Sequence, residues 1–151
     1  MTAEEIAKII IKAFKNGNKL LIVGNGGSAA QSQHLAAELV GKFEHKRKPL
    51  PALALTTDTS ILTAIANDSN FNQVFRRQVE ALGKQEDILL ALTTSGKSEN
   101  ILQAQDAARL RGMKVVSLPY DFGKEMSTAE IQEVHLKMIH DICRIVEEAF
   151  L

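Results

Sequence analysis

The sequence predicts an α/β protein in which helices cover both faces of a parallel β-sheet. Four short, mostly apolar segments alternate with longer segments whose apolar residues recur at helical spacing. Three of the strand ends are rich in Gly, Ser, Thr and Asn. The length of 151 residues and an apolar content of 45% fit a single domain, residues 1–151, with one core.

The first elements have clear local signals. Thr2 followed by Glu5 is a capping-box pattern, which predicts that a helix begins at the N-terminus. The run Lys19–Val23 is continuously apolar after its first residue, as in buried parallel strands. It leads through a glycine-rich turn into a helix from about Ala29 to Phe43.

The same alternation continues to the C-terminus. The remaining predicted elements are a strand at Pro51–Leu55, helical segments at Ile61–Asn67 and Phe71–Leu82, a strand at Asp87–Leu92, a helix at Ser98–Arg111, a strand at Met113–Leu118 and a long helix at Ser127–Phe150.

Composition argues against several partners. Eighteen basic residues balance eighteen acidic ones, so no overall field attracts nucleic acid or an anionic membrane. There is no Trp and one Tyr, which argues against a base-stacking surface. No apolar stretch approaches the ~20 residues of a membrane-spanning helix. We expect neither a nucleic-acid partner nor a membrane partner.

The cysteine content indicates the compartment. Cys143 is the only cysteine, which rules out an intramolecular disulfide and fits a reducing environment. It lies among apolar residues of the last predicted helix, so we interpret it as a core thiol. With no signal-peptide pattern at the N-terminus, a cytoplasmic location is expected.

The segment Thr93–Ser98 is the strongest anion-site candidate. It contains four hydroxyl side chains and one glycine between a predicted strand and the start of a helix. The N-terminus of a helix supplies unpaired N–H groups and partial positive charge, which favour phosphate. The alternative is an ordinary capped turn in which Ser98 is the N-cap.

Two nucleotide-binding motifs are excluded by spacing. Gly96-Lys97-Ser98 resembles the end of a P-loop, but Ala91 occupies the position that requires glycine. The glycine-rich turn that begins at Gly24 matches a dinucleotide fingerprint. That fingerprint requires an acidic residue about 20 residues later, at the end of the next strand, and the nearest candidate there, Asp58, lies 34 residues away.

Acid–base candidates lie on two predicted helices. His34 and Glu38 are four residues apart and therefore share one helix face, where they can bind a metal or share a proton. Gln132 and His140 lie on the last helix, separated by about 12 Å along its axis. His135 points elsewhere, and we expect it to be solvated or to cap a neighbour.

Five motifs, in order, resemble the phosphoheptose isomerases of the SIS (sugar isomerase) family. They are Gly24–Ser28 with His34, Glu38 and Leu39, then Pro51–Asp58, Ala64–Asp68, Thr94–Ser98, and Ile131–His135 with His140. The resemblance covers about Lys19–Leu118 and Ser127 to the end. It implies the three-layer SIS fold, a parallel sheet with helices on both faces.

The resemblance also implies a reaction. It is the isomerisation of sedoheptulose 7-phosphate to D-glycero-D-manno-heptose 7-phosphate, the first step towards the heptose of bacterial lipopolysaccharide. Glu38 and His140 match the catalytic acid–base pair. The matched motifs also imply a set of substrate-binding residues. These are Asn25, Gly26, Gly27, Ser28, Asn67, Asp68, Thr93, Thr94, Ser95, Ser98 and Gln132.

A metal and an assembly are further implications. Some family members carry zinc at the positions of His34, Glu38, Gln132 and His140, and the family forms homotetramers. Gln132 and His140 lie about 12 Å apart along the helix. One ligand can contact both residues only if it lies between their two turns, or if a neighbouring chain supplies one of the two. We therefore favour active sites at subunit interfaces.

One departure concerns the sheet. Leu118 is followed at once by Pro119, where relatives have some two dozen more residues that include another strand. Either this chain truly lacks the segment, or the segment is disordered and the continuous numbering leaves it out. We favour the second alternative, because losing a strand exposes apolar surface.

Two other functions remain open at this point. A non-catalytic SIS adaptor would not need the pair Glu38 and His140, and a sugar-phosphate sensor would need only Thr93–Ser98. The presence of both acid–base residues favours an enzyme.

Overall fold

The computed structural model describes residues 1–151 and contains one four-stranded sheet with the strand order β2-β1-β3-β4. All three strand pairs are parallel. The predicted α/β class is therefore confirmed. The strands are β1 (Leu20–Gly24), β2 (Ala52–Ala54), β3 (Ile88–Leu92) and β4 (Lys114–Ser117).

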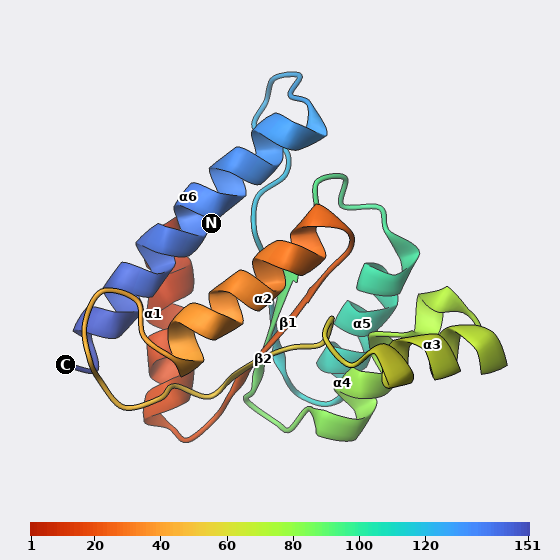
Figure 1. Cartoon of the computed structure of the whole chain (residues 1–151), viewed down its shortest axis with the longest axis horizontal. Coiled ribbons are helices and arrows are strands. Elements are labelled where there is room, and N and C mark those ends of the chain that lie inside the picture. The colour runs from red at the N-terminus through yellow and green to blue at the C-terminus, as the bar shows by residue number, and fades with distance from the viewer.

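Helices form a layer on each face of the sheet (Figure 1). No helix of the chain combines the length and the apolar character that crossing a membrane requires. One layer consists of α1 (Ala3–Lys15), α2 (Gly27–Val40) and α6 (Thr128–Glu148), and the other of α3 (Thr59–Asp68), α4 (Arg76–Leu82) and α5 (Glu99–Leu110).

The central strands separate two apolar cores. Every residue of β1 and β3 is buried, as expected of strands covered on both faces. Successive side chains point to opposite faces. Leu20 and Ile22 therefore join the core beneath α1, α2 and α6, whereas Leu21 and Val23 join the core beneath α4 and α5.

A buried carboxylate fixes the start of the two central strands. Asp87 accepts hydrogen bonds from the backbone N–H of Lys19, at 3.0 Å, and of Lys84, at 2.9 Å, and it pairs with the Lys19 ammonium group. Burial disfavours its charge, but these hydrogen bonds hold the pKa of Asp87 below its ordinary value. The contacts align the entry of β1 with that of β3.

Most predicted elements are present, but one predicted helix is interrupted. The predicted helix Phe71–Leu82 is a short 3-10 turn, Phe71–Gln73, followed by α4. This break leaves Phe71 57% exposed while Val74 and Phe75 enter the core. The predicted capping box at Thr2 forms, and the structure contains a second one at Ser127, which precedes α6.

Of the two alternatives for His135, solvation is wrong, whereas a hydrogen bond that caps a neighbouring group is present. Its side chain is fully buried, and its Nε2 lies 2.7 Å from the carbonyl oxygen of Pro119. Burial lowers the pKa of His135, so the neutral ring donates its Nε2 proton to that carbonyl. Cys143 is buried as expected, and burial raises the pKa of its thiol to about 12.

The chain passes directly from β4 to the connection that leads into α6, which leaves β4 at the edge of the sheet. His135 holds this connection at Pro119. Tyr120 packs against Gly96, where a Cβ would lie 2.1 Å from the ring. A further segment between Leu118 and Pro119 stays a prediction.

Removing side-chain volume from the central sheet should destabilise the fold. We expect Leu90→Ala to lower the free energy of unfolding by about 2–5 kcal/mol, because Leu90 is fully buried in β3. The matched control Leu110→Ala removes the same atoms from a residue that is 82% exposed, and should change it by less than about 0.5 kcal/mol. Urea denaturation measures both; equal effects would contradict the described core.

Candidate active site

The ends of β1 and β3 form a small polar cavity. These strands pair in register, Gly24 opposite Leu92, so the N-termini of α2 and α5 lie at the same edge of the sheet. The cavity has a volume of about 50 Å³. It is lined by Asn25, Ser28, Leu92, Thr93, Thr94 and Ser98. Two helix N-termini with adjacent hydroxyl groups make this a suitable cradle for one phosphate group.

The hydrogen bonds of residues 93–98 argue against the simple capped turn. Thr93 Oγ1 accepts from the N–H groups of Ser95, at 3.3 Å, and Gly96, at 3.0 Å, and Ser95 Oγ accepts from Lys97 N–H at 3.1 Å. Ser98 is the N-cap of α5, but its side chain makes no capping hydrogen bond. Its hydroxyl group therefore remains available to a ligand.

Asn100 is a site residue that the sequence analysis missed. Its side-chain amide and that of Asn25 exchange two hydrogen bonds, each 2.8 Å long. Asn100 is only 3% exposed, so it holds Asn25 in one orientation at the cavity. The sequence did contain one indication of this role. Asn100 is a polar residue on the same buried face of α5 as Ala104 and Ala108.

The acid–base candidates converge where α2 lies beside α6 (Figure 1). His34 Nε2 lies 3.1 Å from Glu38 Oε1 and 3.2 Å from His140 Nε2. The rings of His34 and His140 are 5.2 Å apart, and the Phe43 ring lies 5.6 Å from that of His140. We call His34, Glu38 and His140 the acid–base cluster.

This cluster is suited to moving protons. The contact between two imidazole Nε2 atoms is a hydrogen bond only when one of them carries the proton, and His34 also faces the Glu38 carboxylate. The side chains of His34 and Glu38 are 39% and 24% exposed, so a substrate can reach them. A carboxylate next to an imidazole pair is a suitable arrangement for general acid–base chemistry.

The structure separates Gln132 from the acid–base cluster. Its side chain packs against the start of α2, where a Cβ on Gly27 would lie 2.5 Å from Gln132 Nε2. Its backbone carbonyl accepts a hydrogen bond from Gln31 at 2.8 Å. Gln132 and Gly27 therefore lie at the N-terminal end of α2, as does Gly26, its N-cap.

Asn67 and Asp68 lie apart from the other candidates. Both are exposed at the end of α3, in the helix layer opposite α2 and α6 (Figure 1). Asn67 donates a hydrogen bond of 3.0 Å to Asp68. Within one chain, neither residue contacts the phosphate cradle or the acid–base cluster.

The residues expected to bind zinc form an incomplete set. Imidazole nitrogen and carboxylate oxygen are common zinc ligands, and the acid–base cluster supplies three. Its contacts run in a chain through His34 Nε2, and Gln132 lies elsewhere. The chain has no group of three or more His, Cys, Asp or Glu side chains arranged to hold a metal ion.

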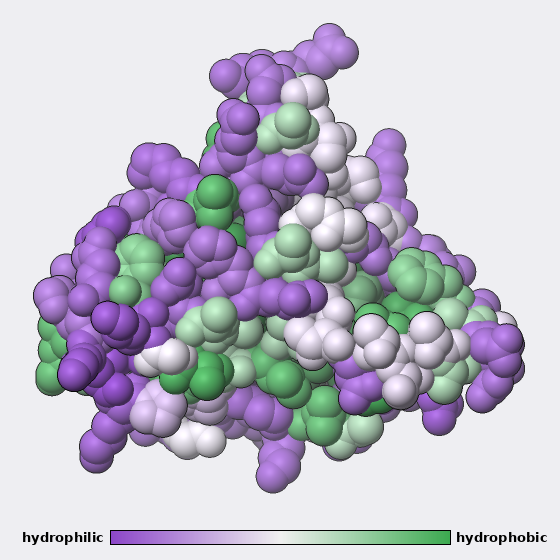
Figure 2. Space-filling model, viewed as in Figure 1, coloured by the Kyte–Doolittle hydropathy of each residue, from purple (hydrophilic) through white to green (hydrophobic).

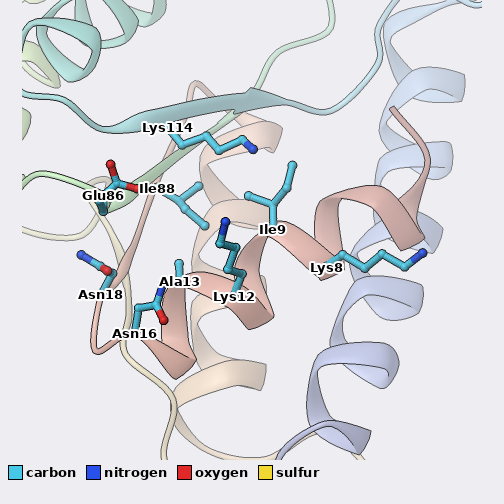
Figure 3. Close-up of a pocket in the computed structure, with 9 residues that line it drawn as sticks. All are labelled: Lys8, Ile9, Lys12, Ala13, Asn16, Asn18, Glu86, Ile88 and Lys114. Carbon is cyan, nitrogen blue, oxygen red and sulfur yellow. The ribbon is translucent and has the colours of Figure 1, made fainter.

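A larger cavity of about 300 Å³ lies at the other end of the strands (Figure 3). It lies between α1 and the first residues of β3 and β4, Ile88 and Lys114. Lys12 and Lys114 extend along it, whereas Lys8 points away. Ligands of such folds bind at the carboxyl ends of the strands, so we do not assign the substrate to this cavity.

Comparison with known proteins identifies the family. The SIS domain family model matches residues 2–119. The phosphoheptose isomerase of Campylobacter concisus is 48% identical over 160 residues, covering 97% of this chain and 85% of that protein. The phosphoheptose isomerase of Bradyrhizobium sp. is 48% identical over 163 residues, covering 99% and 82% respectively.

Solved structures agree with the sequence comparisons. The phosphoheptose isomerase of Francisella tularensis superposes with a TM-score of 0.90 at 39% identity, and GmhA of Neisseria gonorrhoeae with a TM-score of 0.87 at 38% identity. Each comparison covers 97% of this chain and 85% of the other.

These matches confirm the predicted SIS fold and favour a sugar-phosphate isomerase over a non-catalytic adaptor or sensor. The chain belongs to the phosphoheptose isomerases of the SIS domain family.

Proposed function

We propose that this protein interconverts sedoheptulose 7-phosphate and D-glycero-D-manno-heptose 7-phosphate, the first step of heptose biosynthesis for surface polysaccharide. The convergence of His34 and Glu38 from α2 with His140 from α6 carries the proposal. It brings a carboxylate and imidazoles together in a fold that also presents a phosphate cradle. Aldose–ketose isomerisation needs these groups.

The proposed reaction passes through an enediol. The Glu38 carboxylate removes a proton from C1 of the ketose while protonated His140 donates a proton to the C2 oxygen. Glu38 then returns its proton to C2, and His140 takes the proton of the C1 hydroxyl group, which becomes the aldehyde. The phosphate stays bound to Ser28, Thr93, Thr94, Ser95 and Ser98, and this binding orients the reacting carbons.

A spacing argument supports active sites shared between subunits of a homotetramer. Ser28 and Glu38 lie ten residues apart on α2, about 15 Å along the axis. An extended seven-carbon sugar phosphate measures about 10 Å from C1 to phosphorus, given bonds of about 1.5 Å. The substrate is therefore shorter than the separation within one chain. A second chain would supply either the cradle or the acid–base cluster, close enough to the other for one substrate to reach both.

Exposed apolar residues also support an assembly. On α3, Ile61 is 38% exposed, whereas Leu62 and Ile65 are only partly buried against the core. Phe71 is 57% exposed and Leu53 is 42% exposed. Apolar side chains emerge on the lower half of the face in Figure 2. Such surface is characteristic of contacts between subunits.

The proposed location is the cytoplasm. The single thiol, Cys143, is buried and free, which is compatible with a reducing compartment. Sugar phosphates are also intracellular metabolites, since their charge prevents free passage through a bilayer.

The acid–base roles can be tested by NMR with sedoheptulose 7-phosphate. Glu38→Gln and His140→Gln should each lower kcat by about 100-fold or more, because general acid–base catalysis contributes 10²–10⁴-fold. Glu133→Gln, at an exposed position of α6, is the matched control and should leave kcat unchanged. A wild-type protein that binds the sugar phosphate without converting it would instead support a sensor.

Shared sites predict complementation between inactive chains. Ser98→Asp should abolish activity by repelling phosphate, and Glu38→Gln by removing the base. Co-expressed and purified together with two affinity tags, the mixed oligomers should regain activity, because some sites then combine an intact cradle with an intact acid–base cluster. Mixed oligomers without activity would contradict the shared-site proposal. So would a fully active protein that light scattering shows to be a monomer.

Zinc binding to the acid–base cluster is also part of the proposal. His34, Glu38 and His140 would be protein ligands only after their side chains rearrange around the ion, because they are not so arranged in this chain. Gln132 would approach only if the assembly brings one near. Zinc at about 100 times its dissociation constant should stabilise the fold by ~2.7 kcal/mol, measured as a rise in Tm. The rise should vanish in His34→Gln and persist in His45→Gln, an exposed control. No rise in the wild type would exclude zinc here.

A further inference from the structure

A buried ion pair joins the loop after α2 to the end of α6. The side chains of Arg47 and Glu147 are each 1% exposed, and Arg47 Nε lies 3.2 Å from Glu147 Oε1. Removing two charges from water costs free energy that their attraction rarely recovers unless further hydrogen bonds satisfy both groups. In this chain backbone groups form hydrogen bonds with Glu147 and with the two terminal nitrogens of Arg47, whereas Arg47 Nε has no hydrogen-bond partner and faces Glu147 only as an ion pair.

Glu147 binds the loop. Its carboxylate accepts hydrogen bonds from the backbone N–H groups of Phe43, at 3.0 Å, Glu44, at 2.8 Å, and His45, at 2.9 Å. Burial opposes ionisation, but these three donors and Arg47 hold the pKa of Glu147 below its ordinary value. The carboxylate therefore stays charged and keeps the loop against α6.

Arg47 binds the end of α2. Its guanidinium group donates to the carbonyl oxygens of Glu38, at 2.6 Å, and Leu39, at 2.9 Å. Both carbonyls belong to the last turn of α2, where no intrahelical N–H group is available to them. A cation at this end also interacts favourably with the helix dipole.

These contacts reach the acid–base cluster from two sides. Arg47 fixes the backbone of Glu38 itself. Glu147 lies seven residues after His140, on the same face of α6, and binds the N–H group of Phe43, whose ring lies 5.6 Å from that of His140. One ion pair therefore links the backbone of the proposed base to the ring that packs on the proposed acid.

We propose that Arg47 and Glu147 are positioning residues, which hold Glu38 of α2 and His140 of α6 at the separation that proton transfer requires. The inference rests on the proposed isomerase function. Neither residue lies in the phosphate cradle or the acid–base cluster, so both act through Glu38 and His140. Their replacement should affect kcat much more than KM.

The test uses variants that preserve size. Arg47→Lys keeps the charge but loses the planar two-donor fork, and Glu147→Gln keeps the shape but loses the charge and one acceptor. We expect each to lower kcat about 10-fold with KM within about twofold, since a misplacement of 1 Å costs up to ~100-fold. Arg76→Lys and Glu80→Gln, in an exposed pair, are matched controls and should leave both constants unchanged.

A second measurement separates positioning from loss of folding. The chain has only four histidines, so the imidazole NMR signals of His34 and His140 can be assigned by substitution. In folded Glu147→Gln both signals should shift while those of the exposed-pair controls stay in place. Folded variants with wild-type kcat, or with activity lost only in proportion to the unfolded fraction, would overturn the inference. An inactive wild type would instead refute the proposed function.

Discussion

The parallel pairing of β1 with β3 is the constraint on which the site depends. Because Gly24 lies opposite Leu92, both strands end at one level, and the helices that follow them begin there together. Asp87 sets this alignment at the other end of the strands, through its bonds to Lys19 and Lys84. If one strand shifted by one residue, its side chains would move from each core to the other, and the helix N-termini would no longer lie at the same level.

α2 then connects two chemically different regions. Its first turn faces the phosphate cradle, and its last two turns carry His34 and Glu38. α6 runs beside it in the same direction, so Gln132 meets Gly27, His140 meets His34, and Glu147 meets the loop after α2. The rigidity of two long helices therefore sets the distance between anion binding and proton transfer.

Features encoded by neighbouring residues could be predicted from the sequence. The strands, the capping box at Thr2 and the hydroxyl-rich turn at Thr93–Ser98 were predicted in this way, and His34 with Glu38 follows from helical spacing. Contacts between distant segments could not be predicted. Asn100 pairs with Asn25, and Arg47 with Glu147, only because the fold brings them together. The burial of His135 could not be predicted either, because its helix position does not reveal the contact with Pro119.

The open edges of the sheet bear on the behaviour of the protein at high concentration. A sheet edge has unpaired N–H and C=O groups that can pair with another molecule and lead to fibrous aggregates. The edge strands here are short, with three residues in β2 and four in β4, and β4 begins with exposed Lys114. A charged side chain on a short strand opposes the stacking of identical copies, so these edges give little opportunity for the chain to polymerise.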